Sequence, residues 1–165
     1  MEKGLNINRI QLRDGKSQII DNLYRNGLLF VYARTGKGKS LLAKLIYYGL
    51  GGSSPPDVSQ LNQYDEILLE VNINGTDFVL CRELKRPAAA MYIQEGKLES
   101  FRKDDGIKLT LSKSKDPETD FSPHILALLK TPAYVAIPDT ITKSSKPSLI
   151  SFRDISVCLF MAREK

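Results

Sequence analysis

The segment that most constrains this chain is residues 33–40, which read ARTGKGKS. It matches the phosphate-loop pattern G-x-x-x-x-G-K-S/T, except that alanine stands where the usual pattern has its first glycine. An apolar run at residues 28–32 precedes it. Apolar residues follow it at helical spacings, namely Leu41, Leu42, Leu45, Ile46 and Tyr48. A strand, a glycine-containing loop and an amphipathic helix in this order are the setting in which such loops bind phosphate, so we predict a phosphate-binding site here.

Each position of this loop has a physical task. Gly36 and Gly38 permit a turn whose backbone N–H groups surround a phosphate. Lys39 would face the β- and γ-phosphates, the hydroxyl of Ser40 would ligate Mg²⁺, and the following helix would aim its positive dipole end at the same phosphates. The methyl group of Ala33 is the smallest possible departure from the pattern. We therefore predict a catalytic role for Lys39, metal ligation by Ser40, and nucleotide binding by Arg34, Thr35, Gly36, Lys37, Gly38, Lys39, Ser40 and Leu41.

Composition excludes several other classes of protein. With 165 residues, of which 42% are hydrophobic and 26% charged, the chain is expected to form one soluble domain. Its net charge of +5 is compatible with polyanionic partners, although the lysines are scattered. Cys81 and Cys158 lie in apolar stretches without metal-ligand spacing, and His124 is the only histidine, so a zinc site and a catalytic Cys/His pair are excluded. We expect buried free thiols, no membrane segment and a cytoplasmic location.

The remaining elements are read from hydrophobic period and turn residues. Residues 5–12 alternate as a half-buried strand does, residues 18–23 can form a second strand, and Gly49, Gly51 and Gly52 supply a stop for the loop helix. Asn74-Gly75 predicts a hairpin between strands, since this dipeptide favours a tight turn. We place these later elements as hairpin strands at 66–73 and 77–84, short strands at 89–96 and 107–113, a helix at 122–130 with Pro123 in its first turn, an exposed connection at 138–148, and a helical segment from Ser151 onward.

Acidic residues that would activate water are not evident. Hydrolysis usually needs an acid at the end of an apolar strand to hold Mg²⁺ and another to orient the attacking water. Glu70 ends such a run, but it lies within the hairpin and is interpreted as a surface position of an antiparallel sheet. Asp139 follows a brief apolar run that Pro138 interrupts. The catalytic acids are therefore expected outside this chain.

Several aromatic and basic residues are expected to have structural roles only. The tyrosines at positions 24, 32, 47 and 48 are interpreted as core packing. Arg82, Lys85 and Arg86 form a small basic cluster at a strand end, for which we favour a solvated loop over contact with a phosphate backbone. His124 is expected at the surface of a helix's first turn.

The stretches at 27–52, GLLFVYARTGKGKSLLAKLIYYGLGG, and at 67–84, ILLEVNINGTDFVLCREL, carry a family resemblance. Together they resemble the N-terminal lobe of the ATP-binding head of ABC-type ATPases in the SMC and double-strand-break-repair family. This resemblance covers about the first 85 residues. It implies an α/β P-loop NTPase lobe with a mixed, partly antiparallel sheet packed around the loop-following helix. Residues 1–165 would be a single lobe of an incomplete head, with opening strands, loop and helix at 1–52, antiparallel strands at 64–111 and a helical part at 121–165.

The same resemblance implies ATP and Mg²⁺ as ligands, with ATP held between two heads in DNA repair, DNA processing or defence. Hydrolysis would then require a second lobe or head, as a homodimer or in trans, and DNA is a further candidate partner. Arg13 and Asp14 lie where the family's early loop approaches the nucleotide. The last residues look like the segment leading to the Q-loop, as in AAA-type ATPases of bacterial defence systems, but Arg163 stands where a glutamine is expected. A final helix that stops at residue 165 suggests one piece of a longer protein.

Two other functions stay open from the sequence. One is a self-contained P-loop enzyme, such as a small nucleotide kinase or a GTPase, although no NKxD-type guanine-binding motif occurs. The other is a non-enzymatic module that binds DNA or protein and whose loop holds only a structural anion. The role of Lys39 in ATP-dependent association separates these from an ATPase head.

Overall fold

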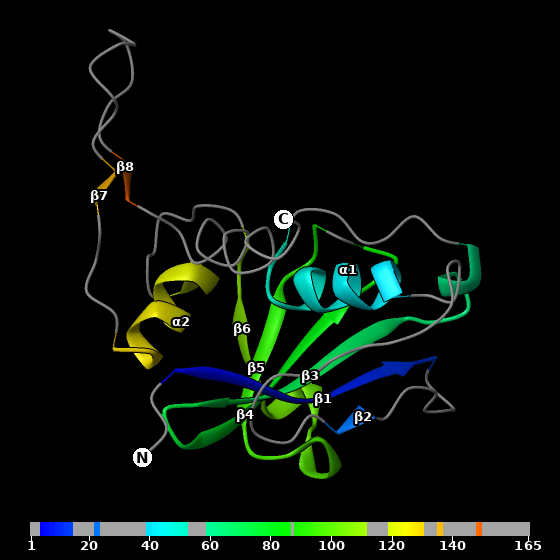
Figure 1. Ribbon diagram of the computed structural model, residues 1–165, viewed down its shortest axis with the longest axis horizontal. Coiled ribbons are helices and arrows are strands. Elements are labelled where there is room, and N and C mark those ends of the chain that lie inside the picture. Colours follow the sequence, from blue (N-terminus) through cyan, green and yellow to red (C-terminus); the bar gives the residue numbers. More distant parts are fainter. Residues whose placement is uncertain are drawn as a thin grey trace, which may run out of the picture.

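The computed structural model describes residues 4–14, 22–23, 39–52, 59–86, 88–111, 119–130, 135–136 and 148–149. Six strands form one sheet in the order β2-β1-β3-β4-β5-β6 (Figure 1). Their bounds are β1 Leu5–Arg13, β2 Asn22–Leu23, β3 Glu66–Ile73, β4 Thr76–Glu83, β5 Met91–Glu95 and β6 Ile107–Leu109. The helices are α1 Lys39–Gly49 and α2 Phe121–Leu128, with 3₁₀ turns η1 Ser59–Leu61, η2 Leu98–Ser100 and η3 Lys103–Asp105. A separate two-stranded pairing joins β7 Val135–Ala136 to β8 Ser148–Leu149.

The sheet is antiparallel in every described ladder. The α/β class is confirmed, but the expectation of a mixed sheet is wrong for the residues that the structure describes. From β3 to β6, each strand pairs with the next one along the chain, and connections of 2 to 11 residues contain no crossover helix of the kind that parallel neighbours need. The one parallel contact in the described ranges is an isolated bridge between Thr110 and Asp120. The strand expected at 28–32 lies outside the described residues.

The hairpin predicted at Asn74-Gly75 is confirmed and sets the register of the sheet. Asn74 has φ 51° and Gly75 has φ 94°, the two positive values that a type I′ turn requires. The side chain of Asn74 also accepts a hydrogen bond from the Gly4 N–H at 2.9 Å and donates one to the Leu128 carbonyl at 3.0 Å. The turn therefore ties the start of β1 and the end of α2 to the same place.

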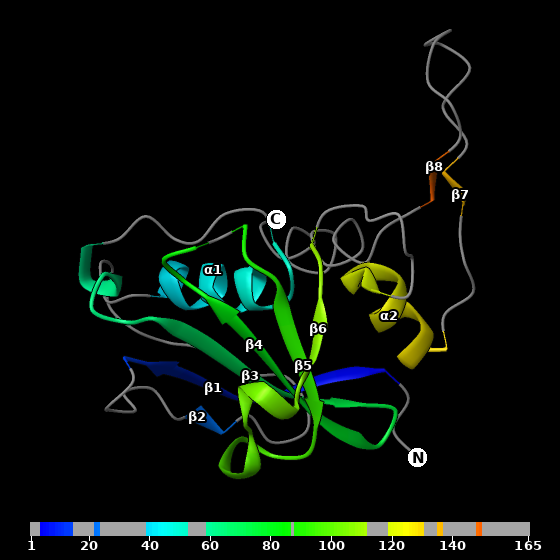
Figure 2. The same cartoon turned by 180° about the vertical axis from the view of Figure 1, so that it is seen from behind.

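Strand alternation divides the core into two clusters on opposite faces of the sheet. We call the face under α1 the helix face; its buried side chains include Ile67, Leu69 and Leu80, which pack with Leu45 and Tyr48 of α1. The other face, which we call the second face, buries a smaller cluster made of Leu68, Val79, Cys81, Leu98 and Phe101. Seen from either side, α1 lies along one face and the η2 and η3 segment lies on the other (Figures 1 and 2).

The remaining predicted elements are partly confirmed. β1 matches the strand predicted at 5–12, β5 and β6 lie within the short strands predicted at 89–96 and 107–113, and α2 begins one residue before the predicted helix at 122–130. Asp120 precedes α2 but makes no side-chain cap; its carboxylate accepts a hydrogen bond from the Thr110 hydroxyl at 3.0 Å. Predictions for residues 138–147 and 151–165, including Asp139, Cys158 and Arg163, fall outside the described residues.

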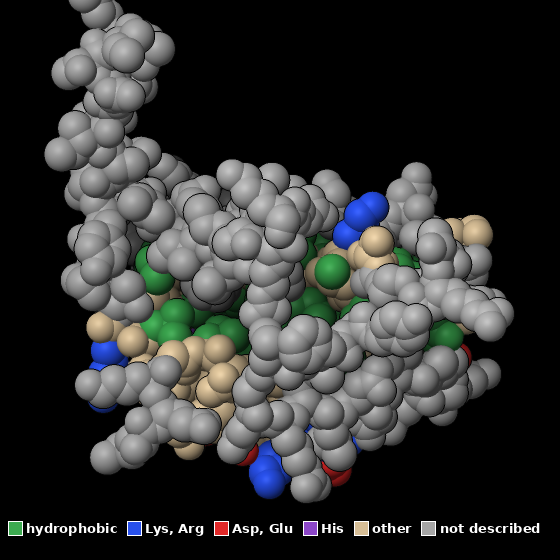
Figure 3. Space-filling model, in the orientation of Figure 1, with side chains coloured by type: hydrophobic (Ala, Val, Ile, Leu, Met, Phe, Trp, Pro, Cys, Tyr) green, Lys and Arg blue, Asp and Glu red, His purple; other side chains and the backbone are tan. Residues whose placement is uncertain are grey.

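Hydrophobic and charged side chains occupy different parts of the described surface. In the view of Figure 3, hydrophobic side chains gather in the middle of the described surface, and Lys, Arg, Asp and Glu side chains lie at its edges. Among described residues, Ile107 on the edge strand β6 is the one large hydrophobic side chain that is strongly exposed, at 57%. Since soluble proteins expose scattered apolar residues routinely, a single one carries no functional meaning.

Candidate nucleotide-binding site

The end of the predicted phosphate loop coincides with the first turn of α1. Lys39 is the first residue of the helix, Ser40 is exposed, and Leu41 is partly buried against the core. The loop residues predicted to bind nucleotide before Lys39, residues 34–38, lie outside the described residues. Because the first turn of a helix has backbone N–H groups without intrahelical partners and carries the positive dipole end, it can receive an anion.

The amphipathic character predicted for this helix is confirmed. Leu45 and Tyr48 are buried, Leu42 and Ile46 are partly buried, and Lys44 is exposed. The buried stripe contacts β3 and β4 of the sheet. The apolar face therefore seats α1 on the helix face of the sheet, while its beginning at Ser40 stays open to solvent.

The far end of α1 approaches the sheet closely at Gly49. A Cβ atom at this position would lie 2.6 Å from Cδ1 of Leu69, a distance that side chains do not tolerate. Gly51, with φ 95°, and Gly52 then end the helix, as predicted: their N–H groups donate to the carbonyls of Tyr48 and Tyr47 at 3.0 Å each.

Arg82 of β4 also holds the C-terminal end of α1 against the sheet. Its side chain is 2% exposed on the helix face, and Nη1 donates hydrogen bonds to the Tyr48 carbonyl at 2.7 Å and to the Gly52 carbonyl. The guanidinium carbon lies 3.7 Å from the centroid of the Tyr48 ring. The Tyr48 hydroxyl in turn donates to the carbonyl of Glu83, and burial raises the pKa of this hydroxyl above its ordinary value. Sheet and helix end are thus joined in both directions.

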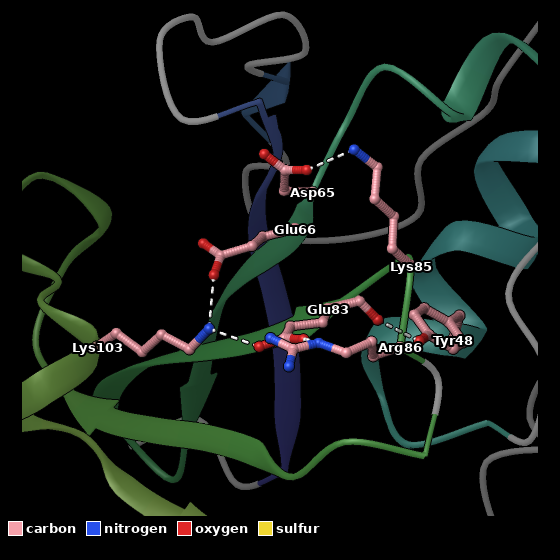
Figure 4. Close-up of polar contacts among 7 residues, drawn as sticks. All are labelled: Tyr48, Asp65, Glu66, Glu83, Lys85, Arg86 and Lys103. Atoms are coloured by element: carbon pink, nitrogen blue, oxygen red, sulfur yellow. Dashed lines mark hydrogen bonds and ion pairs between the residues drawn. The ribbon is translucent and has the colours of Figure 1, made fainter.

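The prediction of a solvated basic cluster at the end of this strand is wrong for Arg82 and holds only for Lys85 and Arg86. Lys85 and Arg86 are exposed, and each pairs with an acid: Lys85 with Asp65 at 2.7 Å and Arg86 with Glu83 at 2.6 Å (Figure 4). These cations are therefore already partly neutralised within the chain.

A sequence signal for the buried arginine does exist. Phe78, Leu80 and Arg82 occupy alternate positions of β4, and the hairpin register pairs Arg82 with Ile67, a fully buried residue. Because residues two apart in a strand share a face, this alternation places Arg82 inward. The predicted basic cluster does not use this alternation, because it groups Arg82 with the cations that follow it in the chain.

Arg13, predicted by resemblance to approach the nucleotide, ends β1. Its Nε donates to Gln11 at 2.8 Å, its Nη2 lies 3.4 Å from the Leu98 carbonyl, and its guanidinium carbon lies 6.0 Å from the Phe101 ring centroid. These contacts are on the second face, and no described contact joins Arg13 to Ser40. The nucleotide role of Arg13 stays a prediction.

Glu70, predicted at the surface, is instead 5% exposed on the second face. Its carboxylate accepts the Leu98 N–H at 3.0 Å and lies 3.8 Å from Nη1 of Arg9, which also pairs with Glu99. The prediction failed because the partners of Glu70 come from distant parts of the chain. This carboxylate is used in holding η2 to the sheet, on the face opposite to α1.

A second group of charges lies where β3 begins and β4 ends. Nζ of Lys103 is 2.8 Å from Glu66 and 2.9 Å from Glu83 (Figure 4). It also lies 5.0 Å from the centroid of the Tyr92 ring. Burial alone would lower the pKa of Lys103, but its hydrogen bonds to the two carboxylates raise it above its ordinary value. The hydrogen bond from Lys103 in turn lowers the pKa of Glu83.

Other titratable residues have structural surroundings. Cys81 is buried, as predicted, and burial together with the charge of Glu66 raises the pKa of its thiol to about 12. His124, expected at the surface, is half-buried, and burial lowers its pKa. Within the described ranges, no three His, Cys, Asp or Glu side chains gather in a way that could hold a metal ion. None of the helices in the described part of the chain has both the length and the apolar composition that crossing a bilayer requires.

A scan against protein-family models found no match to this chain, and comparisons with curated proteins and with solved structures found none either. The class that the structure defines is an α/β fold with an antiparallel sheet, covered on one face by a helix whose first turn is open. A finer identity has to be argued from the chemistry of that helix end.

Proposed function

We propose that this chain binds ATP and Mg²⁺ at residues 33–40 and the first turn of α1, as the N-terminal lobe of an SMC-like ABC ATPase head. One observation carries the proposal. A segment with the phosphate-loop pattern runs directly into a helix whose first turn exposes Ser40, while the other end of the same helix is fixed to the sheet. An open helix beginning on a rigid support is the arrangement by which helix ends bind phosphate.

The chemistry of the proposed site follows from residue types. Lys39 supplies a positive charge for the β- and γ-phosphates, and the Ser40 hydroxyl supplies a ligand for Mg²⁺. The backbone between Arg34 and Gly38 would surround the β-phosphate, with Leu41 following in the first helical turn. Binding in this way requires no acidic residue from the chain.

Hydrolysis is proposed to need a second lobe or head. Glu70, which lies in the middle of β3, is engaged with Arg9 and the Leu98 N–H on the face opposite to α1. It is therefore not placed to orient a water molecule at a phosphate bound by α1. Completion in trans would make ATP the ligand that brings two heads together in DNA repair, DNA processing or defence.

The topology bears on the alternative of a self-contained kinase or GTPase. Such enzymes are built on a largely parallel sheet with helices on both faces, whereas the ladders described here are all antiparallel. The observation counts against a self-contained kinase or GTPase. A module that binds DNA or protein without nucleotide chemistry is the second candidate, and the experiments below separate it. A cytoplasmic location stays a prediction.

Nucleotide binding is tested on the full chain by titration with a fluorescent ATP analogue, with and without Mg²⁺. We expect Lys39→Ala to weaken binding at least roughly tenfold, since it removes a charge-assisted contact to two phosphates. Ser40→Ala should remove most of the Mg²⁺ dependence. Lys44→Ala is the matched control, because Lys44 is exposed on the same helix beyond its first turn. No binding by the unmodified chain, or equal binding by Lys39→Ala, contradicts the proposal.

Assembly and turnover are tested separately. The chain alone should release negligible phosphate from ATP, and steady multiple turnovers without a partner would contradict the incomplete-head proposal. Light scattering with and without ATP should show association that Lys39→Ala abolishes. If partner or DNA binding is unchanged by both ATP and Lys39→Ala, the non-enzymatic module is the better description.

A further inference from the structure

We propose that Arg82 is a positioning residue for the nucleotide site: by fixing the C-terminal end of α1 to β4, it sets the direction in which the first turn of α1 meets the phosphates. The inference rests on the proposed function of that first turn. It assigns to a strand residue outside the phosphate loop a role in phosphate affinity.

The first step is what Arg82 offers the helix end. The last carbonyls of a helix lack intrahelical partners and carry its negative dipole end. Nη1 of Arg82 donates to the Tyr48 carbonyl inside the last turn and to the Gly52 carbonyl just beyond it. One planar guanidinium thus fixes two successive parts of the chain, while its face stacks on the Tyr48 ring.

The second step is that the contact is reciprocal. Tyr48 accepts from the Arg82 side chain through its backbone carbonyl, and its hydroxyl donates to the backbone carbonyl of Glu83, the next residue of β4. One residue later, Gly49 lies against Leu69 of β3 without room for a side chain. Both the rotation of α1 about its axis and its distance from the sheet are therefore fixed at this end.

The third step is that a buried arginine is a costly way to fill space. A buried charge is unfavourable unless it is hydrogen-bonded, and an apolar side chain of similar volume would stabilise a core at least as well. Arg82, however, reaches the Tyr48 and Gly52 carbonyls only when the end of α1 lies in this place. It therefore favours one placement of the helix over other apolar packings of the same residues.

The fourth step is that the length of α1 carries its orientation at Tyr48 to the proposed phosphate site at Ser40. The 11 residues of α1 span about 16 Å. Arg82 holds one end of this length, and Ser40 stands exposed at the other. A small change of angle at Tyr48 becomes a larger displacement at Ser40, where the N–H groups and the hydroxyl have to meet a phosphate and its metal ion.

The test compares ATP-analogue affinity, in Mg²⁺, of the full chain with Arg82→Met, Arg82→Lys and Tyr48→Phe. We expect both Arg82 variants to lose roughly tenfold in affinity, because misplacement of a site by about 1 Å has effects of at least that size. Tyr48→Phe, which removes only the bond to the Glu83 carbonyl, should lose less. Exchange of the amide hydrogens of Leu50, Gly51 and Gly52 should accelerate in the same order, since these amides close the helix end.

Leu68→Ala is the matched control, because Leu68 is fully buried on β3 but belongs to the second face. It should lower the thermal midpoint while leaving affinity at the wild-type value, which separates positioning from general loss of stability. If Arg82→Met does not fold, Arg82→Lys and Tyr48→Phe decide the question. Wild-type affinity in folded Arg82 variants overturns this inference alone, whereas a wild-type chain that binds no nucleotide overturns the proposed function and the inference with it.

Discussion

The two faces of the sheet are built from the same strands but are held by different forces. The helix face is an apolar core under α1, in which Arg82 is the buried charge among the described residues. The second face has a small apolar cluster surrounded by ion pairs, with Glu70 and Arg9 at one place and Lys103 with its two carboxylates at another. Close packing fixes a helix on one side, and charges fasten a short irregular segment on the other. The difference indicates which face can orient a ligand site and which serves mainly to close the sheet.

The largest expected effect, and the strongest test of the difference between the two faces, comes from two neighbouring leucines. Leu69 and Leu68 are both fully buried on β3 and point to opposite faces. Leu69→Ala should cost about 3–5 kcal/mol of unfolding free energy, and Leu68→Ala about 2–3 kcal/mol, because the larger cluster leaves a cavity that relaxes less. Urea unfolding of the two variants measures this. An equal or inverted pair of costs would contradict the asymmetry between the faces.

The next effect concerns the buried carboxylate of the second face. Glu70→Ala leaves the Leu98 N–H without its acceptor and removes the buried carboxylate 3.8 Å from Arg9, and should cost about 1–3 kcal/mol. Glu70→Gln keeps an acceptor oxygen and should cost less. Urea unfolding, with ATP-analogue affinity measured in parallel, tests the prediction. A loss of affinity in Glu70→Gln would show that the second face also orients the ligand site.

The charged group around Lys103 predicts a dependence on pH. The pKa of Glu83 is lowered from 4.5 in the folded chain, so its contribution to stability is present above pH 4.5 and is lost as the pH falls through the lower folded value. The pKa of Lys103 is raised from 10.5, so its contribution is present below pH 10.5 and is lost as the pH rises through the higher folded value. Lys103→Met should flatten both limbs of a plot of urea midpoint against pH.

The loss of stability at low pH is the more specific test of the Lys103 group, because a second residue contributes to the loss at high pH. Cys81 also destabilises the folded chain at high pH, since its pKa is raised from 9.0 to about 12 and only the unfolded thiol ionises between these values. Alkaline loss that persists in Lys103→Met is therefore expected, and Cys81→Ala should reduce it. An unchanged acid limb in Lys103→Met would exclude this ion-pair group as a source of stability.

The smallest effects are expected at Lys85 and Arg86. Both side chains are more than half exposed, and exposed ion pairs contribute little. Lys85→Ala and Arg86→Ala should each change unfolding free energy by less than about 0.5 kcal/mol. They are also the matched charge controls for Arg82, four residues or fewer along the chain. A large effect of either on ATP-analogue affinity would move the site toward this end of the strand.

Local signals predicted the parts of the fold that depend on local chemistry. Asn74-Gly75 specified the hairpin because both residues tolerate positive φ, and the helical spacing from Leu41 to Tyr48 specified α1 with its glycine stop. Glu70 and Arg82 were misplaced for a shared reason. Their burial depends on partners that are remote in sequence, the Leu98 N–H in one case and the end of α1 in the other. Residue type alone predicts exposure for both, and tertiary hydrogen bonds make their burial possible; for Arg82 the alternation along β4 is the one local signal of it.

The pairing of β1 with β3 has a consequence for how the chain folds. Arg13 lies opposite Glu66, and the Asp65 N–H donates to the Arg13 carbonyl at 2.7 Å, so the two ends of residues 14–65, a segment that includes β2, meet at one point of the sheet. The β3–β4 hairpin closes over a two-residue turn, whereas joining β1 requires the ends of this long excursion to meet, which is slow. We expect the hairpin to form first and β1 to dock late, together with α1. A ligand that orders the first turn of α1 would then act on the last step of folding, slowing unfolding more than it speeds assembly.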